Sequence, residues 1–339
     1  MRAYLIKRFL LLIPTLLGIS MLVFMISWIV PGGPIEQEIS RIRFSQQGLT
    51  QRGVGGSDSL ISEEQIEYLK KFYGFDKPIY EAYWDWQKRA LMLDFGISYR
   101  YQEPVLDLVL ERMPISLYFG LVTTIITYLI SVPLGVMKAV YHQTIFDNIS
   151  SFIVFLGYAI PSFIFGLLLI YTLGANFDWL PISGFTSDNF DELGAWQKVG
   201  DVIKHSILPT ACYLIGSFAY MTLLVKNSLL ENLGSPFVRS AVAMGFSRYQ
   251  VFFHHALRNS LIPLAATFGQ TITLVFAGSF LIEKIFNIDG MGLLGYQAVT
   301  ERDYPVVMGT LYMSTLLFLV GNIISDICLA KADARIRFS

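Results

Sequence analysis

Long apolar stretches alternate with polar segments along the whole chain. Six stretches carry almost no charge and run for about 20 residues, the length that crosses the hydrocarbon core of a bilayer as a helix. A helix satisfies its own backbone hydrogen bonds there, and no strand-like alternation of roughly ten residues recurs. The pattern therefore predicts an all-α integral membrane protein with six transmembrane helices. They are Phe9–Val30, Leu117–Met137, Ile149–Leu173, Leu208–Val225, Leu261–Ile282 and Pro305–Ala330.

Proline occupies two kinds of position in these spans. Pro14, Pro133 and Pro161 fall within or near spans, where the ring removes a backbone hydrogen bond and is expected to bend the helix. The other three stand near span starts, where the missing N–H has the smallest cost. These are Pro209, Pro263 and Pro305.

The polar segments divide the chain into four regions, of which the largest outer one contains three local signals. Gln46–Ser59 is rich in Gly, Ser and Gln, which is typical of a loop. Ser62 and Gln65 form the capping box of a helix that we expect to end at Gly74. Tyr80–Leu93 is aromatic and amphipathic, and predicts a helix that lies either on the outer membrane–water interface or on its own loop. The four regions are 1–30 (N-terminal tip and first span), 31–116 (outer loop region with short helices), 117–331 (a five-helix core containing the inner loop 231–263) and 332–339 (tail).

Composition agrees with a membrane location. The 339 residues are 54% hydrophobic and 15% charged, whereas a soluble domain has roughly 25% charged residues. A net charge of −1 gives no reason to expect a nucleic acid partner. Cys212 and Cys328 both sit in apolar runs and are interpreted as small core residues. The first apolar run is too long for a signal-peptide core and lacks a cleavage site, so it is interpreted as a retained span.

The distribution of basic residues predicts the orientation. With both termini in the cytoplasm, the inner segments and inner span ends hold 11 of the 25 basic residues but only four of the 26 acidic ones. Short cytoplasmic loops are enriched in Lys and Arg, so this orientation is favoured. The basic residues are Arg2, Lys7, Arg8, Lys138, Lys226, Arg239, Arg248, Arg258, Lys331, Arg335 and Arg337.

Several chemical signatures are absent from the chain. It contains no P-loop (GxxxxGK[ST]), no GxSxG and no HExxH. Charged residues are nearly missing from the middles of the spans, where an ion-coupled carrier usually keeps at least one. We therefore expect no catalytic residues, no metal site and no cofactor in this chain, and any driving energy would come from another chain.

The inner loop 231–263 has the strongest local signals. Ser235 is a suitable N-cap, Pro236 a suitable first helical residue and Gly245 a suitable helix stop, which predicts a short helix over Pro236–Met244. Ser247 and a glutamine three residues later predict the capped start of a second helix that runs into the next span. Such a helix–turn–helix suits docking into a groove on a partner, although a plain interfacial loop would share these signals.

Within this loop, RSAVAMG at Arg239–Gly245 and HALRNSLIP at His255–Pro263 resemble the EAA loop of ABC-transporter permease subunits. Further segments resemble the peptide and nickel importer branch of that family. Among them, PGGP, GYAIPSF and GLLGY look closest to the Yej-type permeases of oligopeptide and microcin C importers. The segments are Arg8–Ser20, Pro31–Pro34, Tyr73–Ile79, Ser131–Val136, Gly157–Phe163, Gly278–Gly292, Gly292–Tyr296 and Arg302–Val307.

The resemblance implies a fold, a function and partners. The fold would be that of a type I (MetI-like) ABC importer permease in the bacterial inner membrane. The partners would be a paralogous second permease, cytoplasmic ATPase subunits or one tandem ATPase that holds ATP and Mg, and a periplasmic or lipid-anchored substrate-binding protein. Peptide and membrane lipid would be the other ligands. The residues that would contact the ATPase are Arg239, Ser240, Ala241, Ala243, Gly245 and Phe246.

The chain departs from the family pattern in two places. Val242 and Met244 stand where common members have basic residues, so the contact helix carries less positive charge. Near the C-terminus, Asp333-Ala-Arg335 replaces the usual Asp-Pro-Arg. Neither difference changes the class that the resemblance implies.

Polar and aromatic residues on the inner spans are candidates for the substrate path between two permease subunits. Ser and Thr in spans also commonly bond to their own helix or to a neighbour, so packing roles remain an alternative. The absence of fixed mid-span charge would suit peptides of varied charge. The candidates are Ser116, Thr123, Thr127, Tyr158, Ser162, Tyr220, Gln270 and Thr273.

Two alternatives stay open at this stage. The same fold could import another cargo, namely a muropeptide, a dipeptide, glutathione or nickel. A chain of another class, a free-standing channel or secondary carrier, would work without an ATPase.

Overall fold

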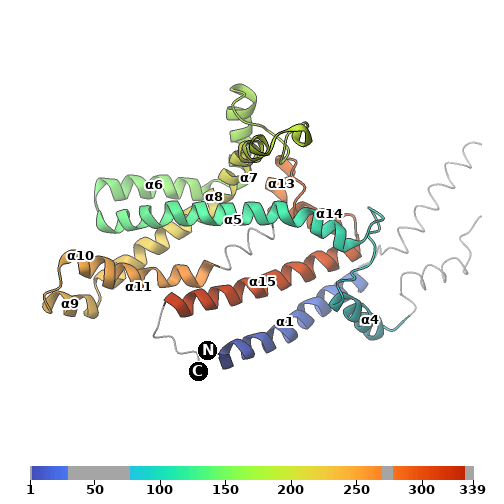
Figure 1. Cartoon of the computed structure of the whole chain (residues 1–339), viewed down its shortest axis with the longest axis horizontal. Helices are drawn as coiled ribbons and strands as arrows, with labels where there is room; N and C mark the ends of the chain where they lie inside the picture. Colours follow the sequence, from blue (N-terminus) through green and yellow to red (C-terminus); the bar gives the residue numbers. More distant parts are fainter. Residues whose placement is uncertain (1, 30–76, 269–277, 333–339) are drawn as a thin grey trace, which may run out of the picture. The chain divides into compact units, whose positions relative to one another are not determined.

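The computed structural model describes residues 2–29, 77–268 and 278–332, and this part of the chain is helical with a single isolated β-bridge between Ile97 and Pro104. Figure 1 shows the helices in chain order. They are α1 (Arg2–Ile29), α4 (Ile79–Leu91), α5 (Val105–Val140), α6 (Ile145–Ala159), α7 (Ser162–Leu169), α8 (Ala195–Leu233), α9 (Pro236–Ala243), α10 (Arg248–Gln250), α11 (Arg258–Ser260), α13 (Phe280–Ile285), α14 (Met291–Thr300) and α15 (Tyr304–Ala332). Two π-helical segments, Ile170–Asn176 and Val251–Leu257, and a 3₁₀ turn at Phe190–Glu192 complete the set.

Four helices in the described ranges are long and apolar enough to cross a membrane, and they match four of the predicted spans: Leu10–Ile29, Val105–Val140, Ala195–Leu233 and Tyr304–Lys331. A fifth is the pair Ile145–Ala159 and Ser162–Asn176, which is bent by 95°. The sixth predicted span, Leu261–Ile282, lies partly outside the described residues, and its 262–268 portion is helical. The predicted helix that follows Ser62 and the loop Gln46–Ser59 also lie outside the described residues.

The bend between α6 and α7 is the one predicted at Pro161. Ile160 has an extended backbone (φ −85°, ψ 123°), as expected for a residue that precedes proline. Pro161 then occupies the N-cap position of α7, where its missing N–H breaks no helical hydrogen bond. Pro14 and Pro133, in contrast, lie inside helices that continue through them.

The chain forms two compact units, which we describe separately. One unit, called the core unit here, comprises Met1–Phe9, Arg112–Leu293 and Leu316–Ser339. The other, called the outer-loop unit, comprises Leu10–Glu111 and Leu294–Thr315.

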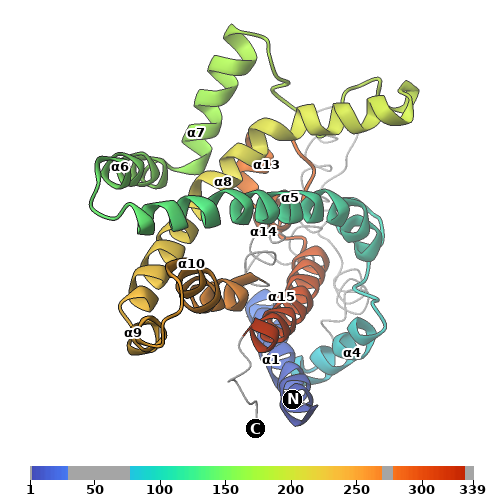
Figure 2. The same cartoon turned by 60° about the vertical axis from the view of Figure 1, so that its left-hand side comes forward.

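In the core unit, α5 and α8 cross very closely. A Cβ placed on Gly135 of α5 would lie 2.6 Å from Cβ of Val225 and 2.8 Å from the carbonyl oxygen of Thr222 on α8. Nearer the α13 end, a buried cluster that includes Phe119, Leu208 and Cys212 packs against α13. Cys212 is therefore a core residue, as predicted. Figures 1 and 2 both show α13 well apart from α9.

Glu283 is a buried carboxylate on α13, just beyond the predicted span that ends at Ile282. Its Oε2 accepts a hydrogen bond from the backbone N–H of Leu293 (2.6 Å), and its Oε1 lies 3.5 Å from the hydroxyl of Tyr213. A Cβ on Gly278 or Gly290 would collide with this carboxylate. Glycine is therefore needed at both positions, because any side chain would meet the Glu283 carboxylate. The carboxyl group also joins α13 to Tyr213 of α8 and to the start of α14 at Leu293.

Stability of the protein is expected to depend on the protonation of Glu283. Burial raises the pKa of this carboxyl from 4.5 to about 7, although the backbone N–H groups of Leu293 and Gly292 oppose the shift. Because the folded-state pKa lies above the unfolded one, the stabilising contribution is complete below about pH 4.5 and is lost as pH rises through about 7. The free energy of unfolding in detergent should fall by up to about 3 kcal/mol between these limits, relative to Glu283→Gln. The same dependence of the free energy of unfolding on pH in the unmodified chain and in Glu283→Gln would contradict this prediction.

In the outer-loop unit, α4 packs one face against α1. The hydroxyl of Ser20 lies 3.0 Å from the Tyr83 hydroxyl and donates to the Gln87 side chain at 3.3 Å. Trp86 is buried against Phe24 and Tyr312. The opposite face exposes large apolar side chains, so the location of α4 at the membrane interface stays a prediction. These side chains are Tyr80, Trp84, Leu91 and Met92.

Asp303 ties two loops of the outer-loop unit together. Its carboxylate accepts hydrogen bonds from the Ser98 hydroxyl (2.5 Å) and from the backbone N–H groups of Tyr99 and Arg100. The side chain of Arg100 also pairs with Glu301. The segment before α5 and the segment before α15 therefore form one connected surface.

Candidate functional site

The segment after α8 folds into a compact helix–turn–helix, called the knob here, that comprises residues 235–257. Ser235 is the N-cap of α9 with an extended backbone, and Pro236 is the first helical residue, as predicted. The Ser235 hydroxyl donates to the carbonyl of Asn232 instead of capping its own helix. Gly245 follows with φ +86°, in the left-handed region that favours glycine. The predicted end of the first helix is therefore confirmed.

The second half of the knob begins at the predicted cap but continues differently. Ser247 and Gln250 form a reciprocal capping box at the start of α10. The chain then follows a π-helical turn over Val251–Leu257 where a plain α-helix was predicted. A π-helix closes its hydrogen bonds five residues apart, so residues at that spacing lie near one face. Val251 and Ala256 have this spacing, and both are buried in the same cluster.

Part of the predicted contact surface faces inward. Val238 and Ala241 are three residues apart on α9 and share a face, which packs against Leu229 of α8 and Ala139 of α5. Ala241 is only 1% exposed. The chain itself covers the face on which Ala241 lies, and contact of Ala241 with a partner stays a prediction.

The outward face of the knob contains the other predicted residues. Arg239, Ser240, Ala243, Gly245 and Phe246 are all exposed. Large apolar side chains surround them: Val242, Met244, Tyr249 and Phe253, with exposed fractions of 58%, 69%, 66% and 45%. The sequence interpretation placed Val242 and Met244 on the contact helix but missed Tyr249 and Phe253.

Ring contacts hold the aromatic part of this surface in place. Phe246 and His255 meet edge to face with centroids 5.4 Å apart, and Tyr249 lies 4.5 Å from Phe253. His254 is exposed and, as a neighbour in a helix, points away from His255. An apolar patch of fixed side chains on an otherwise polar loop is typical of a protein–protein contact.

The charge of the knob has a single sign. Residues 235–260 contain Arg239, Arg248 and Arg258 and no acidic residue. All three arginines are exposed, and Arg258 lies just after the knob. The surface is therefore an apolar patch with a basic rim, which is complementary to an apolar groove with acidic edges.

Comparison with known proteins identifies the family. Residues 131–338, which include the whole knob, match the family model described as the inner membrane component of binding-protein-dependent transport systems. The chain belongs to this family.

Full-length relatives agree with this assignment. The chain is 42% identical to the inner membrane ABC transporter permease protein YejB of Escherichia coli O157:H7, over 100% of this chain and 99% of the relative. It is 38% identical, over 100% and 99%, to the peptidoglycan transport system permease protein YejB of Agrobacterium fabrum. It is 35% identical, over the full length of both chains, to the oligopeptide transport system permease protein AppB of Bacillus subtilis. The predicted class, a multi-pass ABC permease subunit of the inner membrane with an all-α, MetI-like fold, is confirmed.

The candidate path residues of this permease do not share one surface. Thr123 and Thr127 are enclosed by the core unit, while Tyr158 and Tyr220 are 62% and 57% exposed. Ser116 is also buried, and its hydroxyl accepts from the backbone N–H of Met291. Ser162 is half-buried, and Gln270 and Thr273 lie outside the described residues. Their role in transport stays a prediction.

A groove between α5 and α8 lies apart from those candidates. It encloses about 860 Å³ and includes Tyr118, Ser206 and Thr210 in its lining. The Tyr118 and Ser206 hydroxyls lie 2.8 Å apart. Among the described residues predicted for the path, none lines this groove, because the sequence pattern alone does not show which helix faces meet.

Proposed function

We propose that the chain is the membrane-spanning permease subunit of an ATP-driven importer that moves oligopeptides across the bacterial inner membrane. The observation that carries the proposal is the knob, a rigid apolar and basic surface on a chain that contains no P-loop. A transporter subunit without a nucleotide site needs another chain to supply the free energy of ATP hydrolysis.

The knob is the docking surface for that chain. Val242, Met244 and Phe246 would enter an apolar groove of a cytoplasmic ATPase, and Arg239 and Arg248 would meet acidic residues at its edge. ATP and Mg are held by the ATPase subunits, or by one tandem ATPase. The arrangement requires both termini of the permease in the cytoplasm, as the basic residues predict.

Two further partners complete the importer. A paralogous permease forms the other half of the substrate path, and a periplasmic or lipid-anchored binding protein delivers the cargo to the outer loops. Oligopeptide is the favoured cargo because relatives named for oligopeptide and dipeptide transport match over nearly the whole chain. A muropeptide is the second candidate because the relative from Agrobacterium fabrum is named for peptidoglycan transport.

Reconstitution tests the proposal. The chain is copurified with its neighbouring permease and ATPase subunits and placed in liposomes with the binding protein and a labelled peptide. Uptake is expected to require ATP and all subunits, and unlabelled peptide should compete more strongly than a muropeptide. Uptake by the purified single chain without ATP would instead indicate a channel or carrier.

A further inference from the structure

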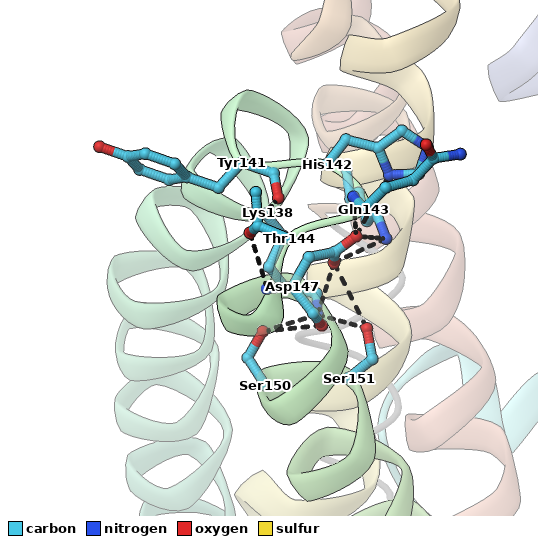
Figure 3. A network of polar contacts seen from close by, with 9 residues as sticks. Lys138, Tyr141, His142, Gln143, Thr144, Asp147, Ser150 and Ser151 are labelled. Atoms are coloured by element: carbon cyan, nitrogen blue, oxygen red, sulfur yellow. Dashed lines mark hydrogen bonds and ion pairs between the residues drawn. The ribbon is translucent and has the colours of Figure 1, made fainter.

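A buried ionic cluster lies in the core unit near the knob. We call it the Asp147 cluster, and it comprises Lys138 of α5, Asp147 of α6, Lys226 of α8 and His142 in the α5–α6 loop, with Ser150 and Ser151 of α6 beside them. Figure 3 shows Asp147 at the centre of the polar contacts made by the labelled residues. The Lys138 side chain is fully buried, and the Asp147 side chain is 3% exposed.

Asp147 joins three parts of the unit. Lys226 donates to both of its carboxylate oxygens, at 2.7 and 2.8 Å. Lys138 lies 3.2 Å from Oδ1, and the backbone N–H of Gln143 donates to Oδ2 at 3.1 Å. His142 also reaches Oδ2 at 3.2 Å. One carboxylate therefore connects α5, the α5–α6 loop and α8.

Lys138 and Lys226 connect different helices to α6. Besides Asp147, Lys138 donates to the hydroxyls of Ser150 and Ser151 (2.9 and 2.6 Å) and to the Asp147 carbonyl, all on α6. It therefore holds α5 to α6. Lys226 donates only to the Asp147 carboxylate among the hydrogen bonds of the described chain, and it is the contact that holds α8 to α6 within this cluster.

The Asp147 cluster is joined to the knob by neighbouring residues on α8 and α5. Leu229, one turn beyond Lys226 on α8, packs against Val238 and Ala241 on the inner face of α9. The same hydrophobic cluster includes Ala139, which follows Lys138 on α5. The knob therefore packs directly on the end of α8, and the ionic contact from there to α6 is Lys226–Asp147.

We propose that the Asp147–Lys226 ion pair is a positioning link that carries movement of the docked knob from α8 to the broken span formed by α6 and α7. The proposal rests on the function proposed above, because the knob is taken to be the ATPase-docking element. In this role the pair does more than stabilise the fold. The cluster holds one buried and one partly buried lysine around a single carboxylate, which is one cation more than charge balance requires.

Two matched substitutions separate a link from a merely structural ion pair. Lys226→Met and Lys138→Met each remove one ammonium group, and each leaves one lysine with one aspartate. Lys226→Met removes the ionic contact between α6 and α8 in this cluster, whereas Lys138→Met leaves it in place. A role in charge balance alone would give the two variants the same phenotype.

The readout is the number of peptides imported per ATP hydrolysed by the complete reconstituted complex. Lys226→Met is expected to lower this ratio about tenfold with the ATPase still bound. A tenfold change is within the range by which single substitutions alter the coupling between two sites. Lys138→Met is expected to keep the ratio within about twofold of the unmodified complex. Lys226→Arg, which retains a cation that can pair with Asp147, should restore most of the ratio. An unchanged ratio in Lys226→Met, or an equal loss in both methionine variants, overturns the proposal.

Two further controls keep the test decisive. If Lys226→Met is not recovered from the membrane, Lys226→Gln replaces it, because its amide still donates to the carboxylate while the charge is lost. We expect a fall of about threefold for this variant, and an unchanged ratio overturns the proposal. Failure of the unmodified chain to bind any ATPase subunit would instead overturn the proposed function of the knob.

Discussion

Replacing Gly245 with arginine is expected to abolish transport-coupled ATP hydrolysis while the chain still inserts in the membrane. Gly245 has φ +86°, and no heavy atom lies within 4 Å of the position that a Cβ would take. The backbone strain is therefore local, roughly 1–2 kcal/mol. The long cationic side chain would stand beside the exposed Met244 and Phe246, in the surface that we propose enters a groove of the ATPase.

Gly245→Asn is the matched control for this experiment. Asparagine tolerates a positive φ better than most residues and has a short uncharged side chain. We expect it to retain most of the coupled activity, so that a loss in the arginine variant reports the blocked surface and not the strained turn. The measurement is ATP hydrolysis by the reconstituted complex with and without cargo-loaded binding protein. Normal coupled turnover in Gly245→Arg would refute the assignment of the knob.

Replacing Gly135 with leucine is expected to destabilise the core unit by more than about 3 kcal/mol. A Cβ alone would come within 2.6 Å of Val225 and 2.8 Å of a backbone oxygen of α8, so the two helices must separate. Overpacking at a close contact costs about 1–3 kcal/mol even where side chains can adjust, and a backbone atom cannot move aside easily. Unfolding of the purified chain in detergent measures the loss.

The same substitution at Gly216 provides the control. Gly216 lies on α8, and no heavy atom lies within 4 Å of the position that its Cβ would take. Leucine there should leave the stability unchanged or raise it by up to about 1 kcal/mol, since it is the better helix former. Equal effects of leucine at the two positions would show that close crossing of α5 and α8 does not limit stability.

Local sequence signals were sufficient for much of the fold. Apolar length predicted five spans that the described residues contain, the third of them broken at Pro161. The N-cap positions at Ser235 and Ser247 and the turn at Gly245 appear where the sequence placed them, although only the Ser247 side chain caps its helix. Each of these features depends on residues close together in the chain, so a short stretch is enough to specify it.

The candidate site was predicted only in part. The position of the knob was correct, but Ala241 faces the core and the exposed Tyr249 and Phe253 were overlooked. Helical periodicity shows that two faces exist, yet which face is covered depends on Leu229 and Ala139 from other helices. The π-helical turn was missed for the same reason, because it aligns Val251 and Ala256 with that distant surface.

By itself, the sequence determined that this chain is a helical membrane protein with a helix–turn–helix in a loop between two spans, and its motifs identified the permease family. Only the tertiary structure decided which residues that loop exposes, where α5 and α8 cross, and that Asp147 lies between two lysines. Asp147 and Lys226 are far apart in the chain, and the residues around each of them give no local signal that predicts the other as its partner. Contacts of this kind follow from how helices pack, and that packing is the sum of many weak side-chain interactions spread over the whole chain.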